Sequence, residues 1–293
     1  MNEKTCTLCP RNCSVDRTVS TGFCGVREQI KIARVGLHLW EEPCISYGSG
    51  SGTVFFSGCN LKCIFCQNRE ISFGLKGKYI SIDTLADEFL RLEQTGAVNI
   101  NLVTPTHYAL QIMRALDKVK HKLSIPVCYN SSGYESVETI RQLKGYIEIF
   151  MPDIKYYSSE FAMRYSCAEN YFEVASNALK QMHENVGYAD FDSQMHLKKG
   201  VLVRHLVLPS LYKDSIAIFE YLAKQYDTSR LAISIMSQFF PTERCTGFPE
   251  INRRITSLEY NKVVSKAKEL GFANGFIQEK SSASEKYHPD FDY

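Results

Sequence analysis

The stretch Ser57-Gly-Cys-Asn-Leu-Lys-Cys-Ile-Phe-Cys-Gln-Asn68 decides how the rest of this sequence is interpreted. It holds three cysteines, Cys59, Cys63 and Cys66, in a C-x3-C-x2-C array. The run at 53–56 that precedes it is β-branched and aromatic, which predicts a buried strand. The array therefore belongs to a loop that begins where a strand ends.

Three thiolates are one fewer than the four that fully ligate a [4Fe–4S] cluster. A cluster on this loop would keep one iron without a protein ligand, open to a small molecule. A structural zinc ion with a fourth ligand from elsewhere in the chain would use the same thiolates. The position of the array directly after a strand favours the cluster.

The composition sets broad limits. The chain of 293 residues can form one large domain or two modest ones, and its 44% hydrophobic and 23% charged residues are ordinary for a soluble protein. The net charge of +2 gives no indication of nucleic-acid binding, and no apolar run is long enough to span a membrane. Eleven cysteines without a secretory signal predict a reducing cytoplasmic location and metal ligation rather than disulfides.

A second group of cysteines, Cys6, Cys9, Cys13 and Cys24, lies at the start of the chain. This segment shows no helix or strand period and is too short to bury a sufficient core, so a metal centre is expected to organise it. Four thiolates complete a zinc site or fully ligate an auxiliary iron–sulfur cluster, and their number does not choose between the two. The lone Cys44 is expected to be a buried structural thiol.

From residue 53 onward, apolar runs alternate with helical patterns. The predicted strands lie at 54–56, 98–103, 127–129, 146–151, 201–208 and 231–236. A long, partly broken helix is predicted at 158–186. A second helix is predicted with Asp214 as its cap, and a third with a Thr256/Glu259 capping box and Gly271 as its stop.

This alternation predicts an α/β fold with a parallel sheet and right-handed crossovers. Six such units fit a partial (β/α)6 barrel, while a flat doubly wound sheet would give the same order of elements. We expect a Cys-rich segment with its linker at 1–50, the barrel at 51–280 and a C-terminal tail at 281–293.

In folds with a parallel sheet, catalytic and ligand-binding residues lie at the carboxyl ends of the strands, along one edge of the sheet. The sequences at these ends are Asn-Leu-Val-Thr104-Pro-Thr-His107, Asn130-Ser-Ser-Gly-Tyr, Pro-Asp153-Ile-Lys155-Tyr and Val-Arg204-His205-Leu-Val-Leu-Pro. Three of these segments also have a simpler structural interpretation. His107 is either a proton donor or a helix-start residue. The Asn130 segment is either a ligand contact or a turn with a Ser132/Glu135 capping box, and Asp153 with Lys155 is either a ligand contact or an ion pair at the rim.

Together these motifs resemble the radical S-adenosylmethionine (SAM) superfamily, in particular the uncharacterised branch related to pyruvate formate-lyase activating enzyme. That branch carries the Cys-x-x-Cys-Pro-Arg head seen here at Cys6 and Cys9 to Arg11. The resemblance covers nearly the whole chain and implies a partial barrel with a [4Fe–4S] cluster and SAM. This sequence departs from the Gly-Gly-Glu stretch of the activases at Thr104.

The resemblance also implies roles for single residues. The open iron takes the amino and carboxylate groups of SAM, and Phe65 lies against the adenine. Asp153 and Lys155 meet the ribose and the charged end of SAM. Arg204, an inward-pointing charge in a strand, meets the SAM carboxylate, and His205 faces the opposite side, toward helices. Thr104 and Asn130 are further candidate SAM contacts.

The expected function is reductive cleavage of SAM to a 5′-deoxyadenosyl radical that removes hydrogen from a substrate. The first candidate substrate is the glycine of a partner glycyl radical enzyme, and the alternatives are another peptide, a small molecule or RNA. A flavodoxin- or ferredoxin-type electron donor is the expected partner, and neither a membrane nor a nucleic-acid partner is expected. A hypothesis of another class is a non-catalytic iron–sulfur or zinc protein for electron transfer or binding.

Overall fold

The structure, a computed structural model, describes residues 5–74, 76–277 and 291. Its described residues form a sheet whose central part is parallel and runs in the order β2-β4-β5-β6-β8-β9-β10. These strands are β2 (Ser51–Phe56), β4 (Ile100–Val103), β5 (Val127–Ser131), β6 (Ile149–Pro152), β8 (Leu197–Leu206), β9 (Ala232–Met236) and β10 (Gly275–Ile277). All six predicted strands are present, and β10 is an additional one.

Three further strands pair antiparallel: β1 (Lys31–His38) with β2, β3 (Lys78–Tyr79) with β1, and β7 (Asp190–Phe191) with β8. The sequence analysis placed a linker where β1 lies, so this part of the prediction is wrong. Only Ile32 and Ala33 of β1 are buried, which gives no alternating pattern. The strand forms because it pairs with the edge of β2.

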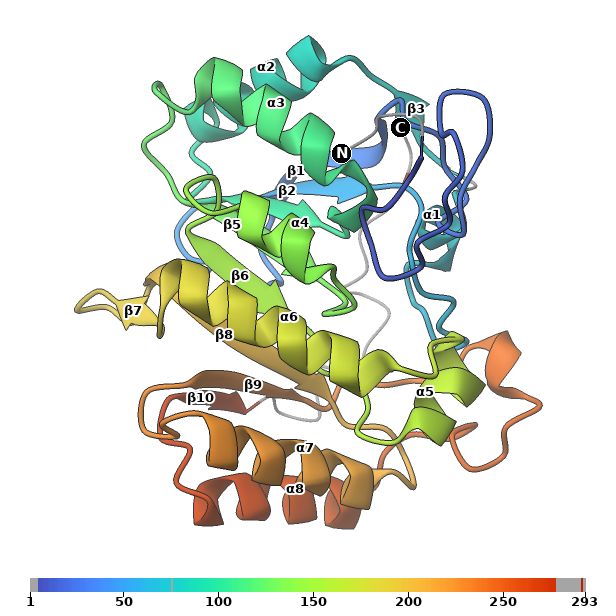
Figure 1. The fold of residues 1–293 in the computed structure, drawn as a ribbon. Helices are drawn as coiled ribbons and strands as arrows, with labels where there is room; N and C mark the ends of the chain where they lie inside the picture. Colours follow the sequence, from blue (N-terminus) through green and yellow to red (C-terminus); the bar gives the residue numbers. More distant parts are fainter. Residues whose placement is uncertain (1–4, 75, 278–290, 292–293) are drawn as a thin grey trace.

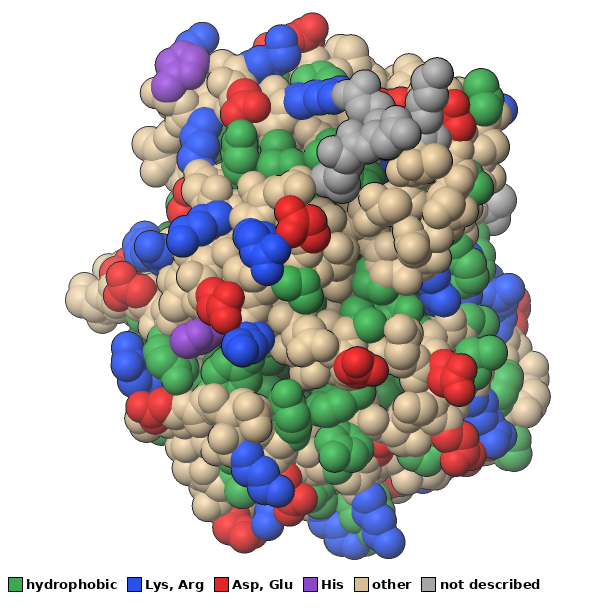
Figure 2. Space-filling view, viewed as in Figure 1, with side chains coloured by type: hydrophobic (Ala, Val, Ile, Leu, Met, Phe, Trp, Pro, Cys, Tyr) green, Lys and Arg blue, Asp and Glu red, His purple; other side chains and the backbone are tan. Residues whose placement is uncertain are grey.

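The helices are α1 (Arg69–Ser72), α2 (Ile82–Gln94), α3 (Ala109–Val119), α4 (Val137–Gln142), α5 (Ser159–Ser166), α6 (Tyr171–Val186), α7 (Tyr212–Gln225) and α8 (Ser257–Glu269), with 3-10 turns η1 (Thr106–Tyr108) and η2 (Glu243–Cys245). Most of them cover one face of the sheet, toward the viewer in Figure 1. The strands point toward the edge where α1, α5 and the N-terminal segment lie (Figure 1). Positive and negative side chains are interspersed over the face shown in Figure 2.

Two helix predictions are confirmed. Thr256 and Glu259 form a complete capping box at the start of α8, and Gly271 follows its end with a φ of +85°. The predicted broken helix at 158–186 is two helices, α5 and α6. Cys167 ends the first of them in the left-handed conformation, with a φ of +55°.

The cap prediction for Asp214 and the capping-box alternative for Ser132 and Glu135 are both wrong. Asp214 lies inside α7 and does not cap it; its carboxylate accepts hydrogen bonds at 2.9 and 2.8 Å from the backbone N–H groups of Tyr157 and Ser158. Ser132 and Glu135 do not form a capping box either, because α4 begins after Ser136 and the carboxylate of Glu135 turns into the core. In both cases a tertiary partner satisfies the side chain in place of the local backbone.

The segment that follows β1 packs in the interior with side chains of the sheet. Cys44 and Ile45 are buried in a cluster with side chains from β5, β6, β8 and β9. The carboxylate of Glu42 accepts a 2.9 Å hydrogen bond from Ser234 in β9. The chain between β1 and β2 is thus an internal part of the fold, and it brings Glu41 beneath the carboxyl ends of the strands. Cys44 is buried, as predicted.

No helix in the described part of the chain is both long enough and apolar enough to cross a membrane.

Candidate active site

A cavity of about 270 Å³ opens at the carboxyl ends of the parallel strands, and Cys59, Cys63 and Cys66 line it together. The loop that carries them starts at Gly58, which has a φ of +92°. A Cβ atom there would come within 2.9 Å of the carbonyl oxygen of Cys24. Only glycine combines this backbone conformation with so close an approach.

Each of the three sulfur atoms has one hydrogen-bond partner. The strongest is the hydroxyl of Ser166, at the end of α5, which donates to Cys63 Sγ at 2.9 Å and also lies 2.8 Å from the hydroxyl of Tyr156. The two longer contacts, both 3.4 Å, are Leu61 N–H to Cys59 Sγ and Cys66 Sγ–H to Ser72 Oγ. The loop is therefore held with its sulfurs in fixed surroundings.

The chemistry of the thiols fits a thiophilic metal cluster. All eleven cysteines of the chain are free, so no disulfide competes. Burial raises the pKa of Cys59 to about 12 and that of Cys63 to about 11. These thiols therefore stay protonated at neutral pH until a metal replaces the proton.

Among the residues that the structure describes, no three Cys, His, Asp or Glu side chains converge on a point where they could hold a single metal ion. This holds for the three cysteines of the loop and for the four at the N-terminus alike. Ligands of a single ion must converge on one point, whereas thiolates of a [4Fe–4S] cluster bind different iron atoms at separate corners.

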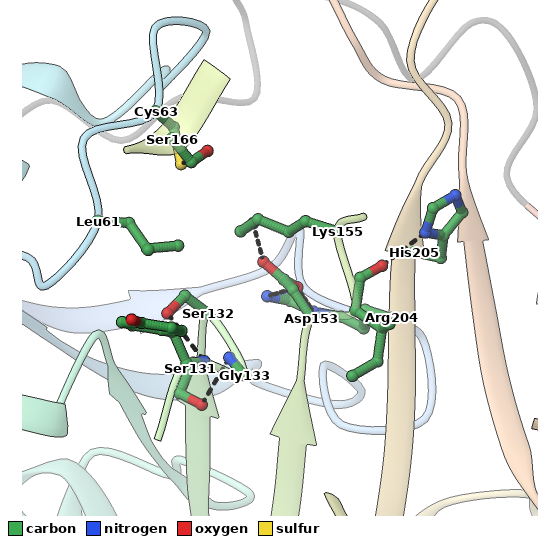
Figure 3. A network of polar contacts seen from close by, with 12 residues as sticks. Leu61, Cys63, Ser131, Ser132, Gly133, Asp153, Lys155, Ser166, Arg204 and His205 are labelled. Atoms are coloured by element: carbon green, nitrogen blue, oxygen red, sulfur yellow. Dashed lines mark hydrogen bonds and ion pairs between the residues drawn. The ribbon is translucent and has the colours of Figure 1, made fainter. Parts of the chain in front are cut away.

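A buried ionic network forms the opposite wall of the cavity. Asp153 accepts a 2.6 Å hydrogen bond from Lys155 and bonds from the guanidinium of Arg204 at 2.9 and 3.0 Å (Figure 3). Arg204 also donates to the side-chain oxygen of Asn130 at 2.7 Å and lies 3.8 Å from the carboxylate of Glu41. Four strand-end predictions, from β5, β6 and β8, thus meet in one connected group.

The charges in this network support each other. Burial alone would raise the pKa of Asp153, but the positive charges of Arg204 and Lys155 outweigh it and hold that pKa below its ordinary value. Arg204 was expected to be a buried cation that meets the carboxylate of SAM. In the structure, the carboxylate of Asp153 already neutralises it. The positive charge of Lys155 also acts on Cys63 and opposes the rise in its pKa that burial causes.

Thr104 lies at the rim of the same cavity and has a strained backbone. Its φ is +58°, a conformation that a β-branched residue rarely adopts. Its N–H donates at 2.9 Å to the carbonyl of Asn130 on the neighbouring strand. This cross-strand hydrogen bond keeps the backbone of Thr104 in its strained conformation. That conformation sets the direction in which Thr104 faces the cavity.

The candidates Phe65 and His107 lie outside the cavity lining, and so does His205, as expected. Phe65 is buried and packs edge-on against Phe239 with ring centroids 5.8 Å apart, so the adenine contact is not supported. The Nε2 of His107 lies 2.8 Å from the carbonyl of Ser57, and burial lowers its pKa to about 3, so it is a neutral structural residue. His205 points to the other side of β8, where it contacts Ser215 of α7 at 2.8 Å (Figure 3).

The sequence analysis missed the residues that the β1–β2 segment brings to the cavity. His38, Trp40 and Glu41 all line it. Trp40 is 62% exposed and Glu41 is largely buried. The single tryptophan of the chain, next to two acids, was the only sequence signal, and it became informative only once β1 placed it.

The N-terminal cysteines lie beside the cysteine loop. Burial raises the pKa of Cys9 to about 12 and also raises that of Cys24, and smaller contributions come from the other cysteines of the head. The carbonyl of Cys24 accepts a 3.2 Å hydrogen bond from the N–H of Cys59. The head thus contacts the central loop directly.

Comparisons with known proteins agree with this geometry. The family model described as "Radical SAM superfamily" matches residues 53–191. An uncharacterized protein of Methanocaldococcus jannaschii is 31% identical over 273 residues, which cover 90% of this chain and 74% of that protein. The chain belongs to the radical SAM superfamily.

Solved structures show the same fold at low sequence identity. HydG, a maturase of the [FeFe]-hydrogenase, superposes with a TM-score of 0.52 at 16% identity, over 75% of this chain and 48% of that one. A spore photoproduct lyase gives a TM-score of 0.51 at 10% identity, over 76% and 74% of the two chains. The present chain spans about half the length of HydG, and at these identities the likeness concerns the fold alone.

Membership in the family implies a [4Fe–4S] cluster and SAM. The three cysteines that line one cavity opposite a charged polar wall fit both.

Proposed function

We propose that this protein cleaves SAM reductively and that the resulting radical removes a hydrogen atom from the glycine of a partner glycyl radical enzyme. The observation that carries the proposal is the joint lining of one cavity by Cys59, Cys63 and Cys66 and by the network around Asp153. When bound, a [4Fe–4S] cluster supplies the electron that converts SAM to methionine and a 5′-deoxyadenosyl radical.

The residues of the cavity have distinct tasks in this proposal. The three thiolates would hold the cluster, leaving one iron for the amino and carboxylate groups of SAM. The carboxylate of Asp153 suits a ribose diol, and the ammonium group of Lys155 suits the carboxylate of SAM. Arg204 and Asn130 orient Asp153, because both belong to the network that fixes it.

The cavity opens at the carboxyl ends of the strands, where a group from a partner could approach a bound cluster and SAM. A glycine residue on a loop of a partner is among the smallest groups that can enter. The exposed indole of Trp40 at the rim offers an apolar contact for the rest of such a polypeptide.

Several finer features belong to the same proposal. They are a partial (β/α)6 barrel, a metal-binding N-terminal segment, a cytoplasmic location and a flavodoxin- or ferredoxin-type electron donor. The tail expected at 281–293 lies outside the described residues, apart from residue 291.

The test uses anaerobically reconstituted full-length protein with SAM and dithionite. We expect 5′-deoxyadenosine from the wild type and from Cys44→Ala, a control cysteine outside both groups, and none from Cys63→Ala. A purified glycyl radical enzyme should then acquire a glycyl doublet in its EPR spectrum, with one SAM consumed per radical. If 5′-deoxyadenosine forms only with a small metabolite or RNA, the glycyl substrate is wrong; if it never forms, the SAM cleavage itself is wrong.

A further inference from the structure

Cys66 lies between two neighbouring spaces. One is the cavity at the carboxyl ends of the strands, and the other is a hollow of about 420 Å³ whose wall includes Cys66, Phe240 and Thr242. Arg69 and Glu243 also line this outer hollow, and their side chains are 45% and 87% exposed. The outer hollow therefore opens to solvent, and one residue expected to ligate the cluster belongs to its wall.

The walls of the outer hollow are tied to the cysteine loop by hydrogen bonds. The hydroxyl of Thr242 donates to the carbonyl of Ile64 at 2.6 Å, and the side-chain amide of Gln67 donates to the carbonyl of Gln238 at 3.2 Å. The segment that leads into η2 is thus held against the loop, and the hollow is formed before any partner binds.

Three cations and two aromatic rings form a continuous row beside the loop. The guanidinium of Arg11 lies 3.8 Å from the ring centroid of Phe23, and the ammonium group of Lys62 lies 5.4 Å from the same centroid. Lys62 is also 4.9 Å from the ring centroid of Phe73, which has the guanidinium of Arg244 at 4.4 Å. Lys62 belongs to the cysteine loop itself, and Arg244 directly follows a residue of the outer hollow, so this cation–aromatic row borders the hollow.

The three cations of the row have no ion-pair partner in the part of the chain that the structure describes. Acids in these segments have other partners. Glu243 pairs with Arg69 at 3.2 Å, and Asp16 of the N-terminal segment accepts hydrogen bonds of 2.9 and 2.6 Å from Thr18. Aromatic faces stabilise a cation only in part, and three like charges repel one another. A surface with this excess of positive charge attracts a partner with acidic side chains.

We propose that the outer hollow and the cation–aromatic row form the docking surface for the protein that supplies the electron, an acidic one-electron carrier. This docking surface rests on the proposed function, because reductive cleavage of SAM requires such a donor. One electron leaves the reduced cofactor of the donor, which is thereby oxidised, and converts a [4Fe–4S]²⁺ cluster to [4Fe–4S]⁺. Cys66 in the wall of the hollow gives this electron a short path to the cluster, and the row attracts and orients the donor.

An acidic protein fits this surface better than a nucleic acid does. Each of the two rings already contacts two cations, so little of their faces is left for stacking on bases, which is how aromatic side chains bind single strands. The formal net charge of the whole chain is only +2, which is not the basic excess typical of proteins that bind nucleic acids.

The first experiment measures binding and does not depend on SAM cleavage. The full-length reconstituted protein is titrated without oxygen against fluorescently labelled flavodoxin, an acidic carrier, at low and at high salt. Arg244→Glu and Lys62→Glu should raise the Kd on the order of tenfold at low salt. Lys180→Glu, the same charge change at an exposed position on α6, should leave the Kd unchanged. Added salt should remove the difference between the variants, and circular dichroism identifies any variant that has not folded.

Three results of this titration would overturn the proposal. The first is an equal Kd in all three folded variants. The second is the absence of binding by flavodoxin and by a ferredoxin at every salt concentration. The third is binding of a single-stranded RNA oligonucleotide that Arg244→Glu abolishes, while the binding of flavodoxin is unaffected.

The second experiment separates the docking surface from the proposed function. With dithionite, a small reductant that needs no docking surface, Arg244→Glu should form 5′-deoxyadenosine at the wild-type rate. With limiting reduced flavodoxin, its rate should fall on the order of tenfold, and Arg244→Lys should retain the wild-type rate. Equal flavodoxin-driven rates in Arg244→Glu and Lys180→Glu would contradict the docking surface.

Two further outcomes assign a failure to its cause. If dithionite yields no 5′-deoxyadenosine even with the wild type, the proposed function is wrong, and the docking surface stands or falls by the Kd values alone. If Arg244→Glu cleaves SAM normally with dithionite but transfers less radical to the glycyl radical enzyme, the surface binds the substrate polypeptide, and the docking proposal is wrong.

Discussion

The hydroxyl of Ser166 lies 2.9 Å from the sulfur of Cys63, although the two residues are 103 positions apart in the chain. The hydroxyl of Tyr156 lies 2.8 Å behind it, so a two-step hydrogen-bond chain ends on a cysteine expected to ligate the cluster. Ser166 and Tyr156 have no exposed surface, and Cys63 is partly buried. A hydrogen bond to a ligand sulfur stabilises the reduced cluster, because that form carries more negative charge.

Replacing Ser166 therefore tests how the protein sets the potential of its cluster. Ser166→Ala should make the midpoint potential more negative, and Tyr156→Phe should have a smaller effect of the same sign. Ser72→Ala, which removes the longer 3.4 Å contact to Cys66, is the matched control and should change it least. Redox titration monitored by EPR gives the three values, and an unchanged potential in Ser166→Ala would contradict the prediction.

Asp153 should be the residue of the ionic network whose loss matters most. Asp153→Asn leaves Lys155 buried with a neutral partner and Arg204 with only the more distant carboxylate of Glu41. This should reduce the free energy of unfolding by about 3–5 kcal/mol and weaken SAM binding at least tens-fold. Glu138→Gln, which breaks an exposed pair with Arg141, should change stability by less than about 1 kcal/mol. Urea denaturation and SAM titration measure the two effects. Unchanged SAM affinity in both Asp153→Asn and Arg204→Ala would remove this network from the binding site.

The strained backbone of Thr104 should lower the stability of the protein while it places the Thr104 hydroxyl for SAM binding. Thr104→Gly removes the cost of a positive φ at a β-branched residue, so the free energy of unfolding should rise by up to about 1 kcal/mol. SAM binding should weaken in Thr104→Gly, because the hydroxyl is lost, and should persist in Thr104→Ser. Equal stability and equal SAM affinity in the wild type and Thr104→Gly would show that the strain has no such role.

Glu135 should make stability depend on pH. Burial raises its pKa from 4.5 to about 7, despite hydrogen bonds from Thr106 and Tyr129. A folded-state pKa above the unfolded one means that folding favours the protonated form. This stabilisation is complete below about pH 4.5 and is lost as the pH rises through about 7.

The isosteric Glu135→Gln variant tests this directly. It should match the wild type near pH 4.5 and exceed its free energy of unfolding by about 3 kcal/mol at pH 8, since each pKa unit corresponds to about 1.4 kcal/mol. The exposed Glu138→Gln should show no such difference. Denaturant unfolding at both pH values checks the prediction, and a constant offset between the two proteins would contradict it.

Local patterns in the sequence were sufficient to predict the parallel strands and the capped helix α8. The six parallel strands and the capping box of α8 follow from short-range rules, because each depends on neighbouring residues. A break somewhere in the helix at 158–186 was also expected, and the structure places it at Cys167. Strand β1 was missed because its side chains do not alternate in burial; pairing with β2 stabilises it, and that partner lies outside any local window.

The same distinction applies to the site. The sequence by itself determined the three cysteines and the polar strand ends Asn130, Asp153, Lys155 and Arg204, because spacing along a loop and position after a strand are local properties. Only the tertiary structure decided that Asp153 neutralises Arg204, that Ser166 reaches Cys63 and that the β1–β2 segment places Glu41 beside them. These contacts join segments separated by tens to hundreds of residues, and burial, charge and hydrogen bonding select them only when the whole chain is packed.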